Sequence, residues 1–434
     1  NIDVNAAALG SFTLTGVSDP TDAGDLESPV VTAYDTYSNV KTNYTGTVTF
    51  TSDDASASLP ANYAFVGGDS GAHTFTNELQ MQTVGTFYVR VNDTVQTGIT
   101  GQQLNIDVNH GPAAAIVYTT QPTGPYAPGA DILVDLEIQD AYGNTVTTGD
   151  DATADITLNL QSGTGALGGT LTKSASGGTV SFTATEGVYV NFSGTGKVIR
   201  ATKVDTTPTG TIARTVDSNS FTINTPPAPT GIVLKAPLSS PDNVDTPTVT
   251  VSGISSGNTI NVYTNSGCSS SVVGSAVAGG TSVDVTASPA LSEATYNFYA
   301  EQVDTYSNVS NCSGVSVTYV LDLTNPNPAT SPTLASGWVQ ANNTSPLFSY
   351  TASGSGDLDH YEVALGTTSG ATDEVGYTPN GTNLSYTFSP SGLTECSQVY
   401  WPTVIAIDTA GNTSSQATHS SGYRVDLTDP DPVT

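Results

Sequence analysis

The chain of 434 residues is short of charge, and the shortage is one-sided. It has 39 acidic but only 9 basic residues, which gives a formal net charge of −30 at pH 7. Charged residues make up 11% of the sequence, against roughly 25% in an average globular protein. Because Lys and Arg are the missing residues, uncharged polar side chains must cover most of the surface. A field of one negative sign argues against nucleic acid and against anionic membranes as partners.

Long apolar runs are also absent. No stretch of 18 or more apolar residues occurs, so we expect no transmembrane helix and no membrane insertion. The sequence has no secretory signal peptide pattern. It opens with Asn-Ile-Asp-Val-Asn rather than Met, from which we expect an internal piece of a longer secreted protein.

Glycine and proline are abundant, with 43 and 24 residues, and they separate short runs rich in β-branched residues. Within these runs apolar and polar residues alternate, as in Val134, Leu136 and Ile138, which are separated by Asp135 and Glu137. A helix would place apolar residues three and four positions apart, and no convincing segment of that kind occurs. The sequence therefore predicts an all-β protein.

A motif with Asp followed four positions later by Asn, at the mouth of a strand-like run, occurs four times. Consecutive copies are 105 residues apart in the first half and 104 apart in the second, which is the length of one β-sandwich. Such a recurrence predicts a string of small β modules. The copies are Asp35–Asn39, Asp140–Asn144, Asp304–Asn308 and Asp408–Asn412.

Repeated segments and Pro-rich linkers predict the module boundaries. The opening pentapeptide recurs at 105–109, and Pro-rich stretches at 225–230 and 323–330 are typical of stiff linkers. We expect four tandem β-sandwiches in an extended rod, which at about 3.3 Å per strand residue would reach roughly 150 Å. The predicted divisions are an end strand of a preceding module or an opening strand at 1–5, modules at 6–110, 111–225, 226–324 and 325–426, and a linker to a further module at 427–434.

Each module resembles a known kind of repeat. Module one, with Val30–Asn39 and Tyr44–Asp53, resembles the bacterial immunoglobulin-like (Big-type) repeats of giant secreted proteins, and module two is similar to a sister repeat around Gln139–Asn144. Module three, with Thr246–Gly253, is similar to a third kind of bacterial immunoglobulin-like repeat. Module four, with Tyr400–Asp408, resembles a fibronectin type III domain. The resemblance implies an extracellular location at a bacterial cell surface, with neighbouring modules of one longer chain as partners.

The Asp of each motif has two interpretations. Asp and Asn side chains cap turns, and carboxylates at strand ends also suit Ca²⁺, which takes six to eight oxygen ligands. For Ca²⁺ at module junctions, the expected ligand pairs are Asp304 with Asp322, and Asp408 with Asp426. No cofactor is required by the sequence, and Ca²⁺ is the one candidate. The same two interpretations apply to an acidic loop cluster of Asp19, Asp22, Asp25 and Glu27.

The three cysteines predict one disulfide. Cys268 and Cys312 lie in the same predicted module, and a bridge between them would stabilise it by roughly 4 kcal/mol in the chain-entropy model. Such a bridge fits an oxidising compartment. Cys396 is left as a free thiol or an intermolecular bridge. Of the two tryptophans, Trp401 is expected in a core, and Trp338 is the candidate for glycan contact.

Signatures of catalysis are poor, and we expect no enzyme. The segment Gly253–Gly257 satisfies G-x-S-x-G, but it lies in a Ser/Gly-rich turn between strands rather than at a strand–turn–helix elbow. The expected function is a stalk of a large bacterial adhesin or fibre, with host or prey surfaces or glycans as outside partners. One alternative is a self-assembling envelope, sheath or filament subunit, whose partners are copies of itself. A second alternative is the non-catalytic carbohydrate-binding arm of a secreted enzyme.

Overall fold

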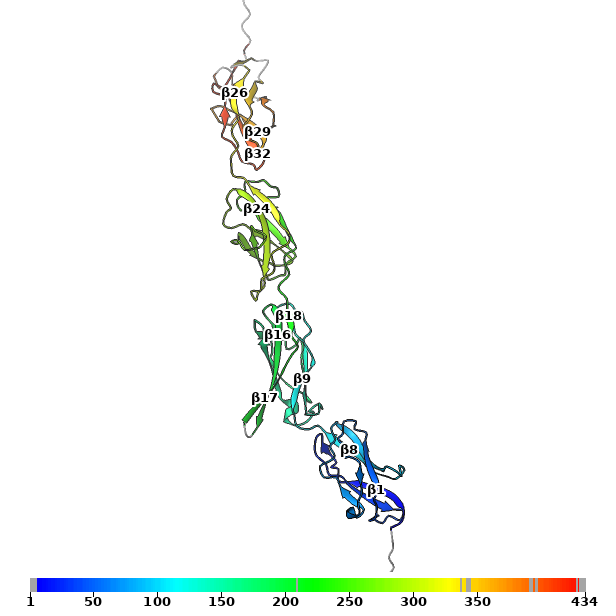
Figure 1. The fold of residues 1–434 in the computed structure, drawn as a ribbon. Coiled ribbons are helices and arrows are strands. Elements are labelled where there is room, and N and C mark those ends of the chain that lie inside the picture. The colour runs from blue at the N-terminus through cyan, green and yellow to red at the C-terminus, as the bar shows by residue number, and fades with distance from the viewer. Residues whose placement is uncertain are drawn as a thin grey trace, which may run out of the picture. The chain divides into compact units, whose positions relative to one another are not determined.

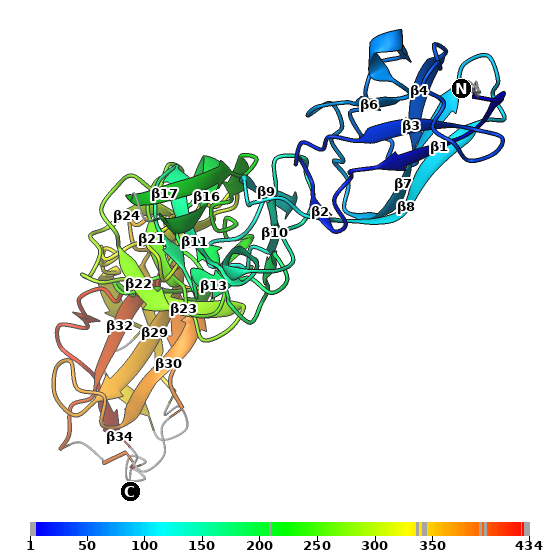
Figure 2. The same ribbon diagram turned by 90° about the horizontal axis from the view of Figure 1, so that it is seen from below.

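The computed structural model describes residues 6–207, 210–335, 338–340, 345–389, 393–394, 397–426 and 428, with only the backbone described at 205–207, 210–213 and 338–340. Regular structure in these ranges consists of β-strands and two short 3-10 turns, η1 (Gly67–Asp69) and η2 (Asp150–Thr153). The strands are drawn as arrows in both views of the ribbon (Figures 1 and 2). The predicted all-β class is confirmed, and no helix in these ranges is long and apolar enough to cross a membrane.

Residues 9–109 form a first sandwich, in which a sheet of order β1-β3-β6 packs on one of order β2-β8-β7-β4-β5. The period-2 alternation of the sequence produces the packing, since Val31 and Ala33 in β3 are fully buried while Thr32 between them is not. The strands are β1 (Leu9–Thr15), β2 (Thr21–Asp22), β3 (Val30–Asp35), β4 (Thr47–Ser52), β5 (Tyr63–Ala64), β6 (Ala72–Thr74), β7 (Gly85–Asp93) and β8 (Thr100–Asn109).

Residues 115–223 form a second sandwich from a sheet of order β14-β10-β9 and a sheet of order β13-β11-β16-β17, to which β18 is added beside β16. The predicted alternation is confirmed in β10, where Val134, Leu136 and Ile138 are buried. A two-stranded pair of β12 and β15 completes the module. The strands are β9 (Ala115–Thr120), β10 (Val134–Gln139), β11 (Asp155–Ser162), β12 (Leu167–Gly168), β13 (Thr172–Ser174), β14 (Thr179–Phe182), β15 (Tyr189–Val190), β16 (Gly194–Thr207), β17 (Gly210–Asp217) and β18 (Phe221–Ile223).

Residues 231–321 form a third sandwich from sheets of order β19-β20-β23 and β22-β21-β24-β25. Its longest strand, β24, carries a tyrosine corner, in which the Tyr296 hydroxyl donates to the Ser292 carbonyl at 2.7 Å. The strands are β19 (Gly231–Ala236), β20 (Thr248–Ser252), β21 (Thr259–Tyr263), β22 (Gly274–Val277), β23 (Ser282–Thr286), β24 (Ala294–Val303) and β25 (Val317–Leu321).

Residues 330–426 form a fourth sandwich from sheets of order β26-β28-β31 and β30-β29-β32-β33, with β27 and β34 as a further pair. The strands are β26 (Thr330–Leu334), β27 (Trp338–Gln340), β28 (Leu347–Thr351), β29 (Leu358–Gly366), β30 (Val375–Gly381), β31 (Ser385–Thr387), β32 (Trp401–Asp408), β33 (Ala417–Thr418) and β34 (Arg424–Asp426).

Each sandwich has its own hydrophobic core. The buried core residues fall at 9–108, 113–223, 232–321 and 329–425, and each range lies inside one predicted module. The chain divides into two compact units, Asn1–Thr225 and Pro226–Thr434, so each unit holds two cores. The predicted end strand at 1–5 lies outside the described residues, as does the linker at 427–434 apart from Thr428. The exact module limits stay predictions.

Candidate functional site: the module junctions

All four Asp…Asn motifs form the same turn. One carboxylate oxygen of the Asp accepts hydrogen bonds from the main-chain N–H groups two and four residues later, and the Asn amide donates back to the carboxylate. The capping interpretation is therefore confirmed. The main-chain donors are Tyr37 and Asn39 for Asp35 (2.9 and 3.0 Å), Tyr142 and Asn144 for Asp140 (2.8 and 2.9 Å), Tyr306 and Asn308 for Asp304 (both 2.8 Å), and Ala410 and Asn412 for Asp408 (2.9 and 2.8 Å).

In the turns of modules one and two these hydrogen bonds lower the pKa of the Asp carboxyl group. In Asp35 the bond from the main chain of Asn39 is the strongest influence, and it lowers the pKa to about 2 against the opposing effect of burial. For Asp140, burial alone would raise the pKa, but hydrogen bonds from the side chain and main chain of Asn144 and from the main chain of Gly111 lower it overall. The turns of modules one and two therefore contain a charged Asp at neutral pH.

The predicted pairing of Asp304 with Asp322 is wrong. Asp304 follows the last residue of β24, whereas Leu321, next to Asp322, pairs with Ala294 at the other end of that strand. The ten-residue β24 therefore separates the two carboxylates by about 30 Å. The antiparallel return of the chain places the turn and the last strand's end at opposite ends of the module.

The pairing of Asp408 with Asp426 is wrong for the same reason. Asp408 ends β32, while Tyr400, just before its start, pairs with Tyr423. Asp426 lies three residues further along, beyond the opposite end of β32. In both modules, the turn and the end of the last strand are separated by the length of a strand.

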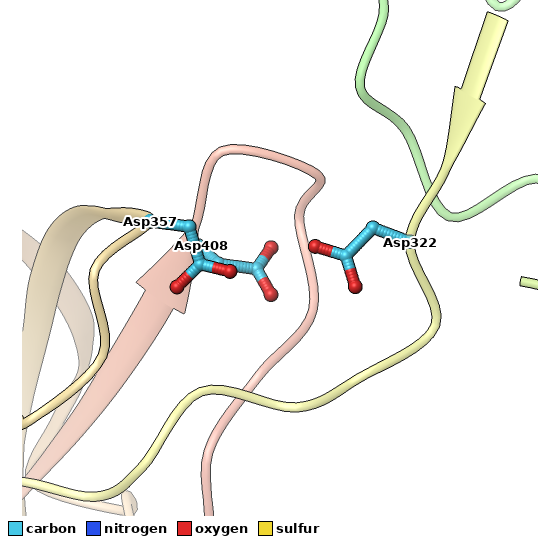
Figure 3. A group of neighbouring side chains, drawn as sticks. All are labelled: Asp322, Asp357 and Asp408. Carbon is cyan, nitrogen blue, oxygen red and sulfur yellow. The ribbon is translucent and has the colours of Figure 1, made fainter. Parts of the chain in front are cut away.

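Asp322 and Asp408 nevertheless come together, across the junction between modules three and four. With Asp357 they form a group whose carboxylate oxygens lie within 4.8 Å of one another. Figure 3 shows the carboxylate of Asp322 pointing toward that of Asp408, with Asp357 beside the latter. Asp408 is buried, Asp322 half-buried and Asp357 exposed. Oxygen ligands so arranged suit Ca²⁺, with water or carbonyl groups completing the six to eight ligands.

Asp357 was missed by the sequence analysis because its position depends on the register of β29. It precedes Leu358, which pairs with Asp408.

Of the acidic loop cluster in module one, Glu27 is buried and accepts hydrogen bonds from Ser18 and Thr21, so this side chain serves the loop itself. The carboxylate of Asp19 accepts from the main chain of Asp107 at 3.0 Å.

The predicted disulfide between Cys268 and Cys312 is present, with Cα atoms 5.5 Å apart. After the Asp304 turn the chain folds back along β24, with the Ser313 N–H donating to Ala300 at 2.7 Å. This return brings Cys312 close to the loop after β21.

Cys396 lies outside the described residues, and so does the side chain of Trp338, whose backbone is part of β27.

Trp401 is only half-buried and does not belong to the core of module four, so its predicted core position is wrong. The neighbouring Tyr400 takes that place: it is 1% exposed, and its hydroxyl accepts a hydrogen bond from the Thr394 N–H at 2.7 Å. The segment Gly253–Gly257 connects β20 to β21 as a turn, as the sequence predicts.

A parallel pairing between the beginning and the end of each module was not predicted. In every module a segment that follows the first strand lies parallel to the last strand, whereas the other ladders are antiparallel. In module two the main-chain N–H of Asn224 donates to the Tyr126 carbonyl at 2.8 Å, and in module three the main-chain N–H of Asp322 donates to the Asp242 carbonyl at 3.1 Å. The pairs are Thr21 with Val108, Tyr126 with Ile223, Asp242 with Leu321, and Trp338 with Arg424.

Two lysines of module two are also buried, which is unusual in a chain with so few bases. The Lys197 ammonium donates to the main-chain and side-chain oxygens of Thr164 and, at 3.3 Å, to the Ser193 carbonyl. Burial lowers the pKa of Lys197. Lys203 pairs with Asp151 at 2.6 Å. Both lie in β16 and point inward, so they serve packing of the module.

No protein-family model matches the chain, and neither does any curated protein. Several solved structures are similar at low identity. The FN1–FN3 domains of chicken CNTN1 are 10% identical, over 72% of this chain and 99% of theirs, with a TM-score of 0.30. The fibronectin(III)-like modules of Clostridium thermocellum CbhA are 9% identical over 47% and 100%, with a TM-score of 0.31. The D00–D0 domain of intimin is 13% identical over 49% and 99%, with a TM-score of 0.28. At such scores the fold rests on the sheets and cores described above.

Proposed function

We propose that this chain is a stalk segment of a large bacterial cell-surface or secreted fibre protein of the bacterial immunoglobulin-like type, and that it is not an enzyme. The observation that carries the proposal is the terminal pair of all four modules, in which a segment that follows the first strand lies parallel to the last strand. When a module is pulled by its two ends, the two members of this parallel pair slide in opposite directions along one axis. All hydrogen bonds between them are then loaded together in shear rather than broken one at a time. This arrangement suits a module that transmits tension.

The proposed stalk is tested by small-angle X-ray scattering with light-scattering mass on the whole chain. A monomer with a maximum dimension of about 150 Å, set by four modules of stacked strands, supports the stalk. A mass that grows with concentration into oligomers or filaments overturns it in favour of a self-assembling envelope or sheath subunit.

Ca²⁺ at the group of Asp322, Asp357 and Asp408 is part of the same proposal. A cation there would offset the repulsion of three close carboxylates and tie module four to the end of module three. Asp357 is the residue to change, because Asp408 also holds its turn and Asp322 caps the Thr324 N–H.

Calorimetric titration of Ca²⁺ into the whole chain should show a site that Asp357→Asn weakens on the order of tenfold. The matched control is Asp150→Asn, which removes one negative charge from module two. Equal Ca²⁺ binding by wild type and Asp357→Asn would overturn the calcium site and leave the stalk proposal standing.

A further inference from the structure

We propose that the Asn that closes the Asp…Asn turn is a junction residue, whose side-chain amide binds the main chain of the preceding module and holds the two modules together. The inference deepens the proposed stalk, because it names the residue that fixes one module on the next. It is carried by two junctions, one in each compact unit.

At the junction of modules one and two, both atoms of the Asn144 amide reach module one. The Nδ2 group donates to the Gln82 carbonyl at 2.8 Å, and Oδ1 accepts from the Val84 N–H at 3.1 Å. The receiving segment is itself fixed, because the carboxylate of the buried Asp54 accepts the N–H groups of Gln82 and Thr83 at 2.8 and 3.1 Å. Asn144 therefore binds a rigid part of module one.

At the junction of modules three and four, the equivalent Asn412 makes the equivalent bond. Its Nδ2 group donates to the main-chain carbonyl of Asp322 at 2.9 Å. The main chain of Asp322 is fixed in module three by its N–H, which donates to the Asp242 carbonyl at 3.1 Å. Asn412 is 8% exposed, so the bond is shielded from water. Two modules of different kinds thus use the same atom of the same motif position for the same purpose.

The chemistry explains why the position is Asn. An amide nitrogen carries two hydrogens. One goes to the Asp of the turn, at 2.9 Å for Asn144 and 3.0 Å for Asn412, and the other goes to the preceding module. An aspartate could donate neither, and a serine hydroxyl has one hydrogen and is too short for both.

The middle residue of the turn supports the same conclusion. The ring of Tyr142 lies so close to Gly24 of module one that an added β-carbon there would be 2.4 Å from the ring, and Gly24 has a φ of +98°. Tyr142 is 40% exposed, whereas its counterpart Tyr37 in module one is 79% exposed. The turn of module two is covered by a neighbour, and the turn of module one is open in the described structure.

Module one provides a matched control. The side-chain amide of Asn39 donates to the two carboxylate oxygens of Asp35, at 3.3 and 3.4 Å. Asn39 is exposed, and within residues 6–207 its side-chain N–H groups have Asp35 as their one acceptor. Asn39→Ala therefore removes the turn bond alone. Asn144→Ala removes the turn bond and both bonds to module one.

The test is hydrogen–deuterium exchange of the whole chain, read at the Val84 N–H. We expect this amide to exchange on the order of tenfold faster in Asn144→Ala than in wild type, and at the wild-type rate in Asn39→Ala. Protection of the Ile138 N–H, which donates to Gly178 inside module two, shows that the module remains folded. Should Asn144→Ala not fold, Asn144→Ser and Asn39→Ser replace the pair, since serine keeps a donor for the turn but cannot reach Gln82.

Unchanged exchange at Val84 in the Asn144 variant, or an equal rise in the Asn39 variant, overturns the junction role. Neither result bears on the stalk, which is judged by the mass and dimension of the wild-type chain. Conversely, oligomers in solution would overturn the stalk and leave the exchange at Val84 as evidence for the junction bond.

Discussion

At the scale of single residues, Tyr44 is the most consequential polar side chain in the core of module one. Its hydroxyl donates to the Asp93 carboxylate at 2.6 Å, and both residues are at most 4% exposed. Burial and the neighbouring charge raise the pKa of Tyr44 far above its ordinary value. The hydroxyl is therefore a permanent donor to a charged acceptor.

We expect Tyr44→Phe to destabilise module one by about 1.5–3 kcal/mol, the usual worth of a hydrogen bond to a charged group. Asp93 keeps its bonds from the N–H groups of Val95 and Gln96, so the loss is limited to one bond. Differential scanning calorimetry measures it as a lower Tm of one transition. The control is Tyr63→Phe. The Tyr63 side chain is half-buried, and its hydroxyl donates to the Asp69 carboxylate at the longer distances of 3.2 and 3.3 Å. A loss as large for this control would contradict the argument from burial.

Acid should weaken module one through its turn carboxylates. Hydrogen bonding lowers the pKa of Asp35 to about 2, from 3.8 in an unstructured chain. Because the folded pKa is the lower one, the stabilisation is complete above pH 4 and is lost as the pH falls toward 2. Thermal melts at pH 5, 4, 3 and 2 should show this fall. In Asp35→Asn the stability should depend less on pH over that range, and an unchanged slope would count against Asp35.

At the scale of elements, the disulfide is the feature whose energetic contribution is easiest to isolate. It closes a loop of 44 residues in sequence separation between Cys268 and Cys312. In the chain-entropy model its removal destabilises module three by about 4 kcal/mol. Cys268→Ser combined with Cys312→Ser should lower the Tm of one calorimetric transition and leave those of modules one and two in place. A loss shared by all transitions would mean that the modules do not unfold separately.

Strands were predictable from the sequence where one face is buried and the other is not. In β10 the buried residues Val134, Leu136 and Ile138 alternate with polar ones, and this pattern identified the strand. In β32 the residues from Pro402 to Ala406 are all buried, so no alternation shows which residues face the core. Tyr400 rather than Trp401 lies in the core of module four.

The junctions were less predictable because they depend on pairing between distant segments. The turn motif and its spacing were visible, but which end of the sandwich each Asp occupies follows from the register of β24 and β32. The sequence contains no local signal for that register. For this reason the sequence predicts Asp322 and Asp408 as junction residues but with the wrong partners, and it does not predict Asp357.

At the scale of the whole molecule, four cores with parallel terminal pairs predict a characteristic response to force. Stretching one chain should produce four separate unfolding events, each releasing about 100 residues at up to ~3.6 Å per residue. Ala23→Pro removes the N–H that donates to Asn109 at 2.8 Å beside the parallel pair of module one. It should lower the force of one event, while Ala23→Gly, which keeps the N–H, should lower it less. Equal forces in the two variants would argue against the terminal pair as the resisting element.

The placement of the basic residues has a consequence for survival among proteases. Enzymes that cleave after Lys or Arg find no such residue between Lys235 and Arg424. Upstream, Lys197 and Lys203 are buried in β16, where a protease cannot bind the extended chain. Digestion by a trypsin-like enzyme would therefore leave most of modules three and four as one fragment even after unfolding. Scarcity of positive charge therefore leaves the long stretch between Lys235 and Arg424 without a cleavage site for a whole class of hydrolases.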